Sequence, residues 1–206
     1  APYALKEIET YRAASAPQAF YYPVPDDRSR PGYFYVNTYN LPARPIYTMT
    51  ALALHEAVPG HHLQIAIAQE LSHLPDFRRH MMLLGYVEGW GLYAESLGYE
   101  MKMLNDPYQH YGALTFEIWR ACRLVVDTGL HSKRWTRQQA VDYMKKYTAN
   151  SEADIWSEVD RYVVLPGQAV SYKIGELTIK RLRKLAQNKL KDSFDLCAFH
   201  DTVLKH

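Results

Sequence analysis

The chain has 206 residues with a formal net charge of +2 at pH 7, and 48% of the residues are apolar while 22% are charged. This composition excludes disordered, collagen-like and coiled-coil chains, and the small net charge argues against nucleic-acid binding driven by electrostatics. No apolar run reaches the roughly 18 residues that span a bilayer, so the sequence predicts a soluble protein with no membrane span.

The N-terminal part is predicted to contain one short helix, two loops and one strand. Helix formers favour a helix over residues 4–14, and the prolines that follow favour a surface loop over residues 16–31. The aromatic and β-branched run at residues 32–38 is the best strand candidate, and residues 40–45 read as another loop. An open edge of that strand could hold an extended peptide by main-chain hydrogen bonds.

The rest of the chain is predicted to be helical. Thr136 and Ser151 are expected to cap two of the helices. The strand count is too low for a doubly wound sheet, so the sequence predicts a mainly α, multi-helix fold forming one domain over residues 1–206, with a short strand or hairpin near the N-terminus. The helices are expected over residues 48–58, 61–72, 76–104, 108–129, 137–147, 152–164 and 168–190, followed by a short element after Ser193.

The helix expected over residues 76–104 contains four glycines, Gly85, Gly89, Gly91 and Gly98. Each glycine costs about 1 kcal/mol relative to alanine in a helix interior. Such a cost indicates close contact with another helix, a ligand pressed against the backbone, or a break in the helix.

The most informative segment is H-E-A-V-P-G-H-H, which begins at His55. Zinc peptidases commonly use H-E-x-x-H on a helix, because two histidines four residues apart share a face and can bind one ion, while the glutamate takes a proton from the attacking water. Here the fourth position after His55 is Pro59, which cannot bind metal. If Pro59 and Gly60 are an insertion, His61 restores the pattern, with Glu56 as the general base.

Helix geometry decides whether that insertion is credible. On an unbroken helix His61 would lie about 240° around from His55, and His62 would share its face but lie about 10 Å along the axis. A regular helix therefore offers no metal site. Pro59 and Gly60 permit a kink that could turn His61 back toward His55. The alternative is that these histidines lie at a capped helix end, solvated or bonded to nearby carbonyl groups.

A second cluster, E-G-W-G-L-Y-A-E, begins at Glu88 and ends at Glu95, so its two acidic residues share one helix face. Carboxylates on an apolar helix are costly to bury unless they are paired or bind a metal. A catalytic zinc site takes three protein ligands and one open position. We expect Glu88 as the third ligand and Glu95 as a residue that orients a ligand histidine. The alternative is a salt bridge from either glutamate to Arg120 or Arg123.

Three separated motifs together resemble the bacterial family called domain of unknown function 885. They are H-E-A-V-P-G-H-H-L-Q, E-G-W-G-L-Y-A-E and L-P-G-Q-A-V-S-Y-K-I-G, and the resemblance extends over nearly the whole chain. It implies a zincin-like, mainly helical metallopeptidase with Zn2+ held by His55, His61 and Glu88 and with Glu56 as the base. The resemblance leaves the contribution of His62 open.

Members of that family are usually longer than this chain. The resemblance therefore implies that the chain is the C-terminal catalytic portion of a longer polypeptide, whose missing N-terminal half could supply one wall of the cleft. It also implies a bacterial, exported setting, either periplasmic or as a lipoprotein.

Several other polar residues are candidates for the reaction itself. Hydrolysis needs a donor for the developing oxyanion, which tyrosine or histidine often supplies. Tyr172 is the first candidate, followed by Tyr162 and His131.

Three basic residues could bind the substrate. Arg120, Arg123 and Lys173 could recognise a substrate carboxylate by paired hydrogen bonds. Equally, they could neutralise buried acids such as Asp127.

These observations predict a zinc-dependent hydrolase that cleaves peptide bonds. One alternative is a catalytically silent helical module that binds metal or peptide, which would have no need of Glu56 beside His55. Another is a metal-dependent amidase or esterase, which a substrate panel would distinguish.

Overall fold

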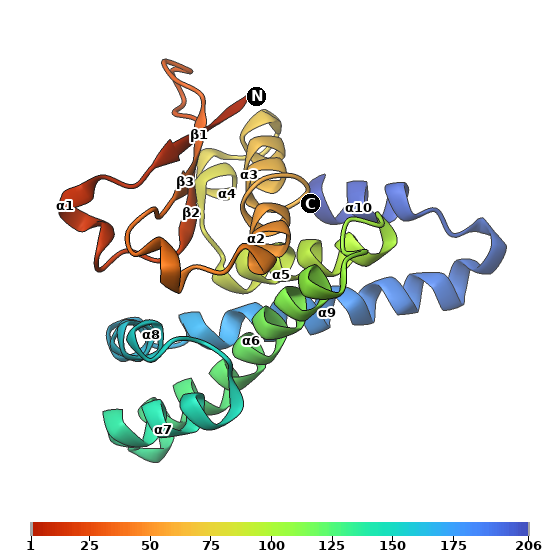
Figure 1. Cartoon of the computed structure of the whole chain (residues 1–206). Helices are drawn as coiled ribbons and strands as arrows, with labels where there is room; N and C mark the ends of the chain where they lie inside the picture. The colour runs from red at the N-terminus through yellow and green to blue at the C-terminus, as the bar shows by residue number, and fades with distance from the viewer. Residues whose placement is uncertain (1, 206) are drawn as a thin grey trace.

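The computed structural model describes residues 2–205, a mainly helical chain with a small sheet at its N-terminal end (Figure 1). The sheet has the strand order β1-β3-β2, formed by β1 (Tyr3–Glu7), β2 (Ala19–Tyr22) and β3 (Gly32–Val36). β1 runs parallel to β3, whereas β2 runs antiparallel to it with Ala19 opposite Val36. The strand expected at residues 32–38 is therefore confirmed as β3.

Three predictions for the N-terminal part are wrong. Residues 4–14 hold most of β1 and only a short helix, α1 (Thr10–Ala13), and the loop expected at residues 16–31 contains β2. Pairing with β3 overrides the helix propensity of β1. β2 was missed because its short run of one alanine and three aromatic residues lies between Pro17 and Pro23, which favour a loop. Because β3 lies between the other two strands, the open edge expected on residues 32–38 is closed, and the free edges belong to β1 and β2.

The helices follow the sequence prediction closely from residue 137 onward, where three of them begin and end as expected. Thr136 forms a capping box with Gln139, and the Ser151 side chain accepts a hydrogen bond from the Asp154 backbone N–H. The helices are α2 (Met49–Glu56), α3 (His61–Glu70), α4 (Asp76–His80), α5 (Leu84–Glu100), α6 (Pro107–Lys133), α7 (Arg137–Tyr147), α8 (Glu152–Val164), α9 (Gln168–Leu190) and α10 (Leu196–Lys205), with short 3-10 turns at Leu41–Ala43, Ile46–Thr48 and Lys191–Ser193.

The single helix expected over residues 76–104 is wrong, because the chain is extended between α4 and α5. Met81 and Leu83 both have extended backbone angles, and Met82 between them lines the large cavity described below. A tertiary contact of this kind is not encoded in the local sequence pattern. The break is one of the outcomes that the glycines of this segment allowed.

The largest core lies where α6 packs against α7 and α8 (Figure 1). A second contact, between α5 and α9, brings two backbones together at Gly89 and Gly175, since a Cβ on Gly89 would lie 2.5 Å from the Cα of Gly175. The interpretation of the glycines as sites of close helix contact is thus confirmed at Gly89. Among residues 2–205, no helix combines the length and the apolar character that a membrane span requires.

The backbone contact between α5 and α9 generates a test of stability. Gly89→Ala is expected to lower the free energy of unfolding by about 1–3 kcal/mol, because the new methyl group must push two helices apart. Gly85→Ala is the matched control on the same helix, since a Cβ there meets no atom within 4 Å. Urea unfolding of both variants measures the difference, and equal stabilities would contradict this account of the contact.

Candidate metal centre

The site begins with the chain reversal between α2 and α3, at the break expected from Pro59 and Gly60. Gly60 has φ −77° and ψ −134°, outside the helical range, and the Val58–Pro59 peptide bond is cis. A Cβ on Gly60 would lie 1.9 Å from the carbonyl oxygen of His55, so only glycine allows the loop to lie this close to the end of α2. The indole Nε1 of Trp90 donates a 2.7 Å hydrogen bond to the carbonyl oxygen of Pro59 and fixes the loop to α5.

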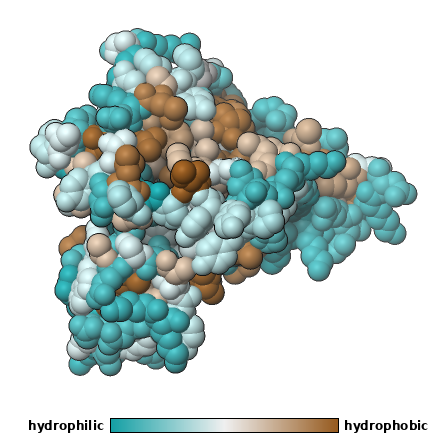
Figure 2. All heavy atoms as spheres, viewed as in Figure 1, coloured by the Kyte–Doolittle hydropathy of each residue, from teal (hydrophilic) through white to brown (hydrophobic). Residues whose placement is uncertain are grey.

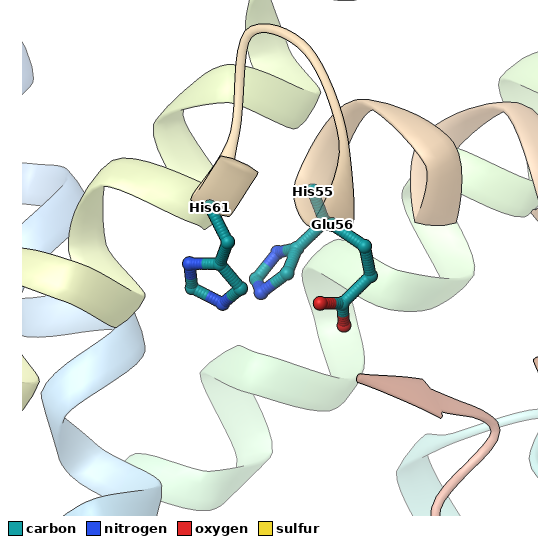
Figure 3. A group of neighbouring side chains, drawn as sticks. All are labelled: His55, Glu56 and His61. Carbon is teal, nitrogen blue, oxygen red and sulfur yellow. The ribbon is translucent and has the colours of Figure 1, made fainter. Parts of the chain in front are cut away.

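The reversal brings His55 and His61 into contact. Their ring centroids are 4.5 Å apart with planes at 85°, and Figure 3 shows the two imidazoles side by side, with Glu56 on the other side of His55. Ligand atoms of His55, Glu56 and His61 all lie within 4.8 Å of one another, and all three residues are buried. This group could hold a metal ion.

A fourth side chain, Glu88 of α5, lies against both imidazoles. Its Oε2 is 3.6 Å from Nε2 of His55 and 3.3 Å from Nε2 of His61. Tetrahedral zinc with bonds of about 2.0–2.2 Å separates its ligand atoms by about 3.3–3.6 Å, so these spacings fit a common ion. Two imidazole nitrogens and a carboxylate oxygen are also a donor set that suits zinc.

Two carboxylate oxygens at this place have no hydrogen-bond partner among residues 2–205. They are Oε2 of Glu56 and Oε2 of Glu88, and both are buried. Buried polar atoms are nearly always satisfied, and exceptions often mark a missing ion or water. A cation beside the two histidines would satisfy the Glu88 oxygen, and a water molecule next to it would satisfy Glu56.

Glu95 of α5 connects the site to an arginine on α6. Its Oε1 accepts from Nδ1 of His55 at 2.7 Å and from Nη2 of Arg120 at 2.8 Å. Glu95 therefore contacts an imidazole and also forms a salt bridge with Arg120. With Nδ1 engaged in this way, Nε2 of His55 is the nitrogen that faces Glu88.

The charges of this group support one another. Burial lowers the pKa of His55, but the neighbouring carboxylates of Glu88 and Glu95 outweigh that effect and raise the pKa to about 9. Burial likewise raises the pKa of Glu88, but the two histidines outweigh it and hold the pKa well below its usual value. A cation bound at His55 must therefore displace a proton at neutral pH.

Two glycines of α5 make room for these contacts. A Cβ on Gly91 would lie 2.7 Å from Cε1 of His55, so the imidazole rests directly on the helix backbone. Gly89 provides the contact with α9 described above. The segment from Glu88 to Glu95 thus supplies a carboxylate, a helix contact, a hydrogen bond to the loop and a space for the imidazole.

His62, whose role the sequence leaves open, points toward the sheet. Its Nδ1 lies 2.9 Å from the hydroxyl of Tyr21, and its ring contacts those of Tyr3 and Tyr21. The structure therefore places His62 beside the strands and not beside His55.

Of the three candidate donors for an oxyanion, only Tyr172 lies at the group. Its ring stacks on His55 at 6.1 Å, and its hydroxyl accepts from Nε2 of Gln168 at 2.9 Å. Burial raises the pKa of Tyr172, so the phenol keeps its proton at neutral pH.

Tyr162 and His131 lie elsewhere. The Tyr162 hydroxyl accepts from Nε of Arg123 at 2.8 Å and from Nε1 of Trp119 at 3.0 Å, while burial raises its pKa to about 12. His131 is exposed on α6 and its Nε2 lies 2.9 Å from the carbonyl oxygen of Tyr162. Both residues support the helix packing from outside the cavity, so the expectation that they act on the substrate finds no support in their positions.

Of the three basic candidates for substrate binding, two lie at the site and one does not. Arg120 and Arg123 line the cavity that contains the histidines, whereas Nζ of Lys173 binds Glu117 and Glu176. Asp127 accepts from the backbone N–H of Gly167. Lys173 is therefore the basic candidate that the structure does not bring to the site.

The cavity has a volume of about 350 Å³. In Figure 2 the surface is indented between the part that contains the sheet and the part that contains α7 and α8. Sequence reasoning missed three of the lining residues, Glu158, Arg161 and Gln168. Gln168 belongs to the third motif and its Nε2 donates to Oε1 of Glu88 at 3.2 Å, but no signal in the sequence pointed to the two residues of α8.

The fold has close counterparts among solved structures. A crystal structure from Colwellia psychrerythraea, described as a "putative lipoprotein", matches with TM-score 0.97 and 44% identity over 99% of this chain and 35% of that chain. A structure from Shewanella oneidensis, described as a "putative lipoprotein of unknown function", matches with TM-score 0.81 and 24% identity over 99% of this chain and 38% of that chain, a likeness of fold alone. No curated protein matches the sequence.

The chain thus spans little more than a third of the length of these two proteins. A family described as "Bacterial protein of unknown function (DUF885)" matches residues 1–206. The resemblance inferred from the three motifs agrees with this match, and the chain belongs to the DUF885 family.

Proposed function

We propose that this chain carries the catalytic centre of a zinc-dependent peptidase. The observation that carries the proposal is the convergence of two imidazole nitrogens on one carboxylate oxygen: Nε2 of His55 lies 3.6 Å and Nε2 of His61 lies 3.3 Å from Oε2 of Glu88, in a cavity that Glu56 also lines. These three side chains are the proposed ligands. The position next to Glu56 is left for water and substrate.

Each neighbouring residue has a defined task in the proposed reaction. A zinc ion held by His55, His61 and Glu88 would supply Lewis-acid activation for the hydrolysis. Glu56, whose Oε2 has no protein partner among the described residues, accepts the proton of the attacking water and delivers it to the leaving amine. Tyr172 keeps its phenolic proton and donates to the developing oxyanion. Glu95 holds His55 in the orientation that presents Nε2.

The free edge of β2 supports a peptide as the substrate. The backbone N–H of Asn37 donates to the carbonyl oxygen of Gln18, so Gln18 and Asn37 are a hydrogen-bonded pair. In an antiparallel ladder such pairs alternate with pairs whose N–H and C=O groups point away from the partner strand. The peptide groups of Ala19 and Tyr21 therefore turn away from β3, and both residues line the cavity that contains His55. An extended peptide could add to this edge as a further strand.

The remaining parts of the proposal concern the longer polypeptide. The matched proteins are almost three times as long as this chain, so another part of the polypeptide could form a second wall of the cleft. Their description as lipoproteins supports an exported bacterial setting. The substrate therefore belongs to the envelope or to the exterior of the cell.

The ligand assignment is tested by zinc binding. Loss of a residue that only orients a metal ligand typically weakens metal affinity about 10- to 100-fold. We expect His61→Ala and Glu88→Gln each to weaken zinc affinity by more than this. His62→Ala is the matched control, because its imidazole contacts Tyr3 and Tyr21 and is not part of the group of possible ligands. Competition with a chelator of known affinity measures all three variants. Equal loss in His62→Ala, or none in Glu88→Gln, would show that the ligands are assigned wrongly.

The role of Glu56 is tested by separating metal binding from hydrolysis. Glu56→Gln is expected to retain zinc and to lower the rate of peptide cleavage by about 100- to 10,000-fold, because the water loses its proton acceptor. Glu100→Gln serves as control, since Glu100 pairs with Arg183 outside this cavity. Rates are measured on a panel of peptides, simple amides and esters with the full-length polypeptide. Cleavage of esters alone would indicate an esterase, and zinc binding without any turnover would indicate a binding module.

A further inference from the structure

The wall of the cavity opposite β2 carries three arginines that the proposed hydrolysis does not use. Arg120 and Arg123 come from α6, and Arg161 comes from α8. All three line the same cavity as His55 and Glu56. Arg120 and Arg123 are almost completely buried.

Two carboxylates form ion pairs with these three guanidinium groups. Arg120 binds Glu95, which His55 also shares. Glu158 alone accepts from both Arg123 at 2.9 Å and Arg161 at 2.6 Å. The cluster therefore holds one positive charge more than the carboxylates that contact it.

Of the other acids that line the cavity, Glu56 and Glu88 belong to the group around the two histidines. Asp154 also lines the cavity, but its carboxylate accepts from the hydroxyl of Ser151. Asp127, one helical turn after Arg123, accepts from the backbone of Gly167. A buried positive charge without a matching carboxylate is costly, and an anionic ligand removes that cost.

Arg123 is held as a preformed receptor. Its Nε donates to the Tyr162 hydroxyl, and its guanidinium lies 4.2 Å from the Trp119 ring and 4.6 Å from the Tyr172 ring. Its Nη1 is buried and has no hydrogen-bond partner within residues 2–205. A guanidinium fixed between rings with one unused donor is well suited to binding a carboxylate.

We propose that Arg123, which shares the carboxylate of Glu158 with Arg161, binds a carboxylate group of the substrate, so that cleavage occurs close to that carboxylate. The carboxylate is either the C-terminal group of a peptide or an acidic side chain. This inference rests on the proposed peptidase function and narrows it to substrates that carry a negative charge beside the scissile bond. Arg120 is assigned a different role, because the carboxylate that it binds, Glu95, also holds the imidazole of His55.

The position of Tyr172 sets the scale of the subsite. Its ring lies 6.1 Å from the His55 imidazole and 4.6 Å from the Arg123 guanidinium, so these two groups are at most about 11 Å apart. One to three residues of an extended chain, at about 3.5 Å each, can bridge such a span. A peptide anchored at Arg123 would therefore present one of its last few bonds to Glu56.

The first experiment compares substrates on the zinc-loaded full-length polypeptide. Peptides with a free C-terminal carboxylate are compared with their C-terminal amides, and peptides with an internal Asp or Glu are compared with the Asn or Gln analogues. A preference of about 10- to 100-fold in kcat/KM for one charged member is expected, as for a hydrogen bond to a charged group. The acid–amide pair identifies a C-terminal carboxylate, and the other pair identifies a side chain. Equal rates within both pairs would overturn the proposal.

The second experiment assigns the preference to Arg123. Arg123→Lys keeps the charge but loses the planar fork, so the preference for the charged peptide should fall about 10-fold or more, with the larger change in KM and not in kcat. Arg137→Lys is the matched control, because Arg137 also pairs with a carboxylate, Asp160, and stacks on an aromatic ring, Trp156, outside the cavity. A preference that survives in Arg123→Lys would overturn the assignment.

Binding separates this inference from the peptidase proposal. In the Glu56→Gln variant, calorimetric titration with the acid peptide and the amide peptide is expected to show the same preference without turnover. Preferential binding without cleavage in the parent would retain the carboxylate subsite and reject the peptidase function. Cleavage in the parent combined with equal binding of both peptides would retain the peptidase function and reject the carboxylate subsite.

Discussion

The structure of the site depends on one chain reversal, in which four residues turn the end of α2 into the start of α3. Gly60 lies so close to the carbonyl group of His55 that no larger residue fits, and Trp90 holds the adjacent carbonyl group of Pro59. This constraint places His61 against His55, although a continuous helix would point the two imidazoles apart. Without the reversal, the carboxylate of Glu88 would lie beside a single histidine, and the free-energy cost of burying its charge would not be offset.

The helix α5 shows how one short segment can serve packing and chemistry together. Glu88 and Glu95 reach the same imidazole from two turns of one face, and Gly91 between them removes the side chain that would collide with it. The intrinsic cost of glycine in a helix is therefore offset by contacts that only glycine permits. The buried carboxylates in turn depend on His55, His61 and Arg120, so that helices far apart in the chain are held together by charge.

Much of this arrangement could be predicted from the sequence, because helix periodicity, capping residues and the spacing of the motifs are local properties. The helices after residue 137 begin and end as expected, and the break at Pro59 and Gly60 lies where the pattern requires it. The strands β1 and β2 could not be predicted, since their pairing with β3 is decided by contacts distant in sequence. For the same reason Arg161 and Glu158 were missed, and Tyr162, His131 and Lys173 were proposed for a cavity that they do not line.

The central claim is that two imidazoles and one carboxylate bind the same ion, and zinc K-edge X-ray absorption spectroscopy of the stoichiometrically loaded protein tests it most directly. The account predicts a four-coordinate ion with two imidazole nitrogens and oxygen ligands at about 2.0–2.2 Å, and no sulfur. It further predicts that the signature of one imidazole disappears in His61→Ala. A six-coordinate, water-rich spectrum with at most one imidazole would contradict the claim.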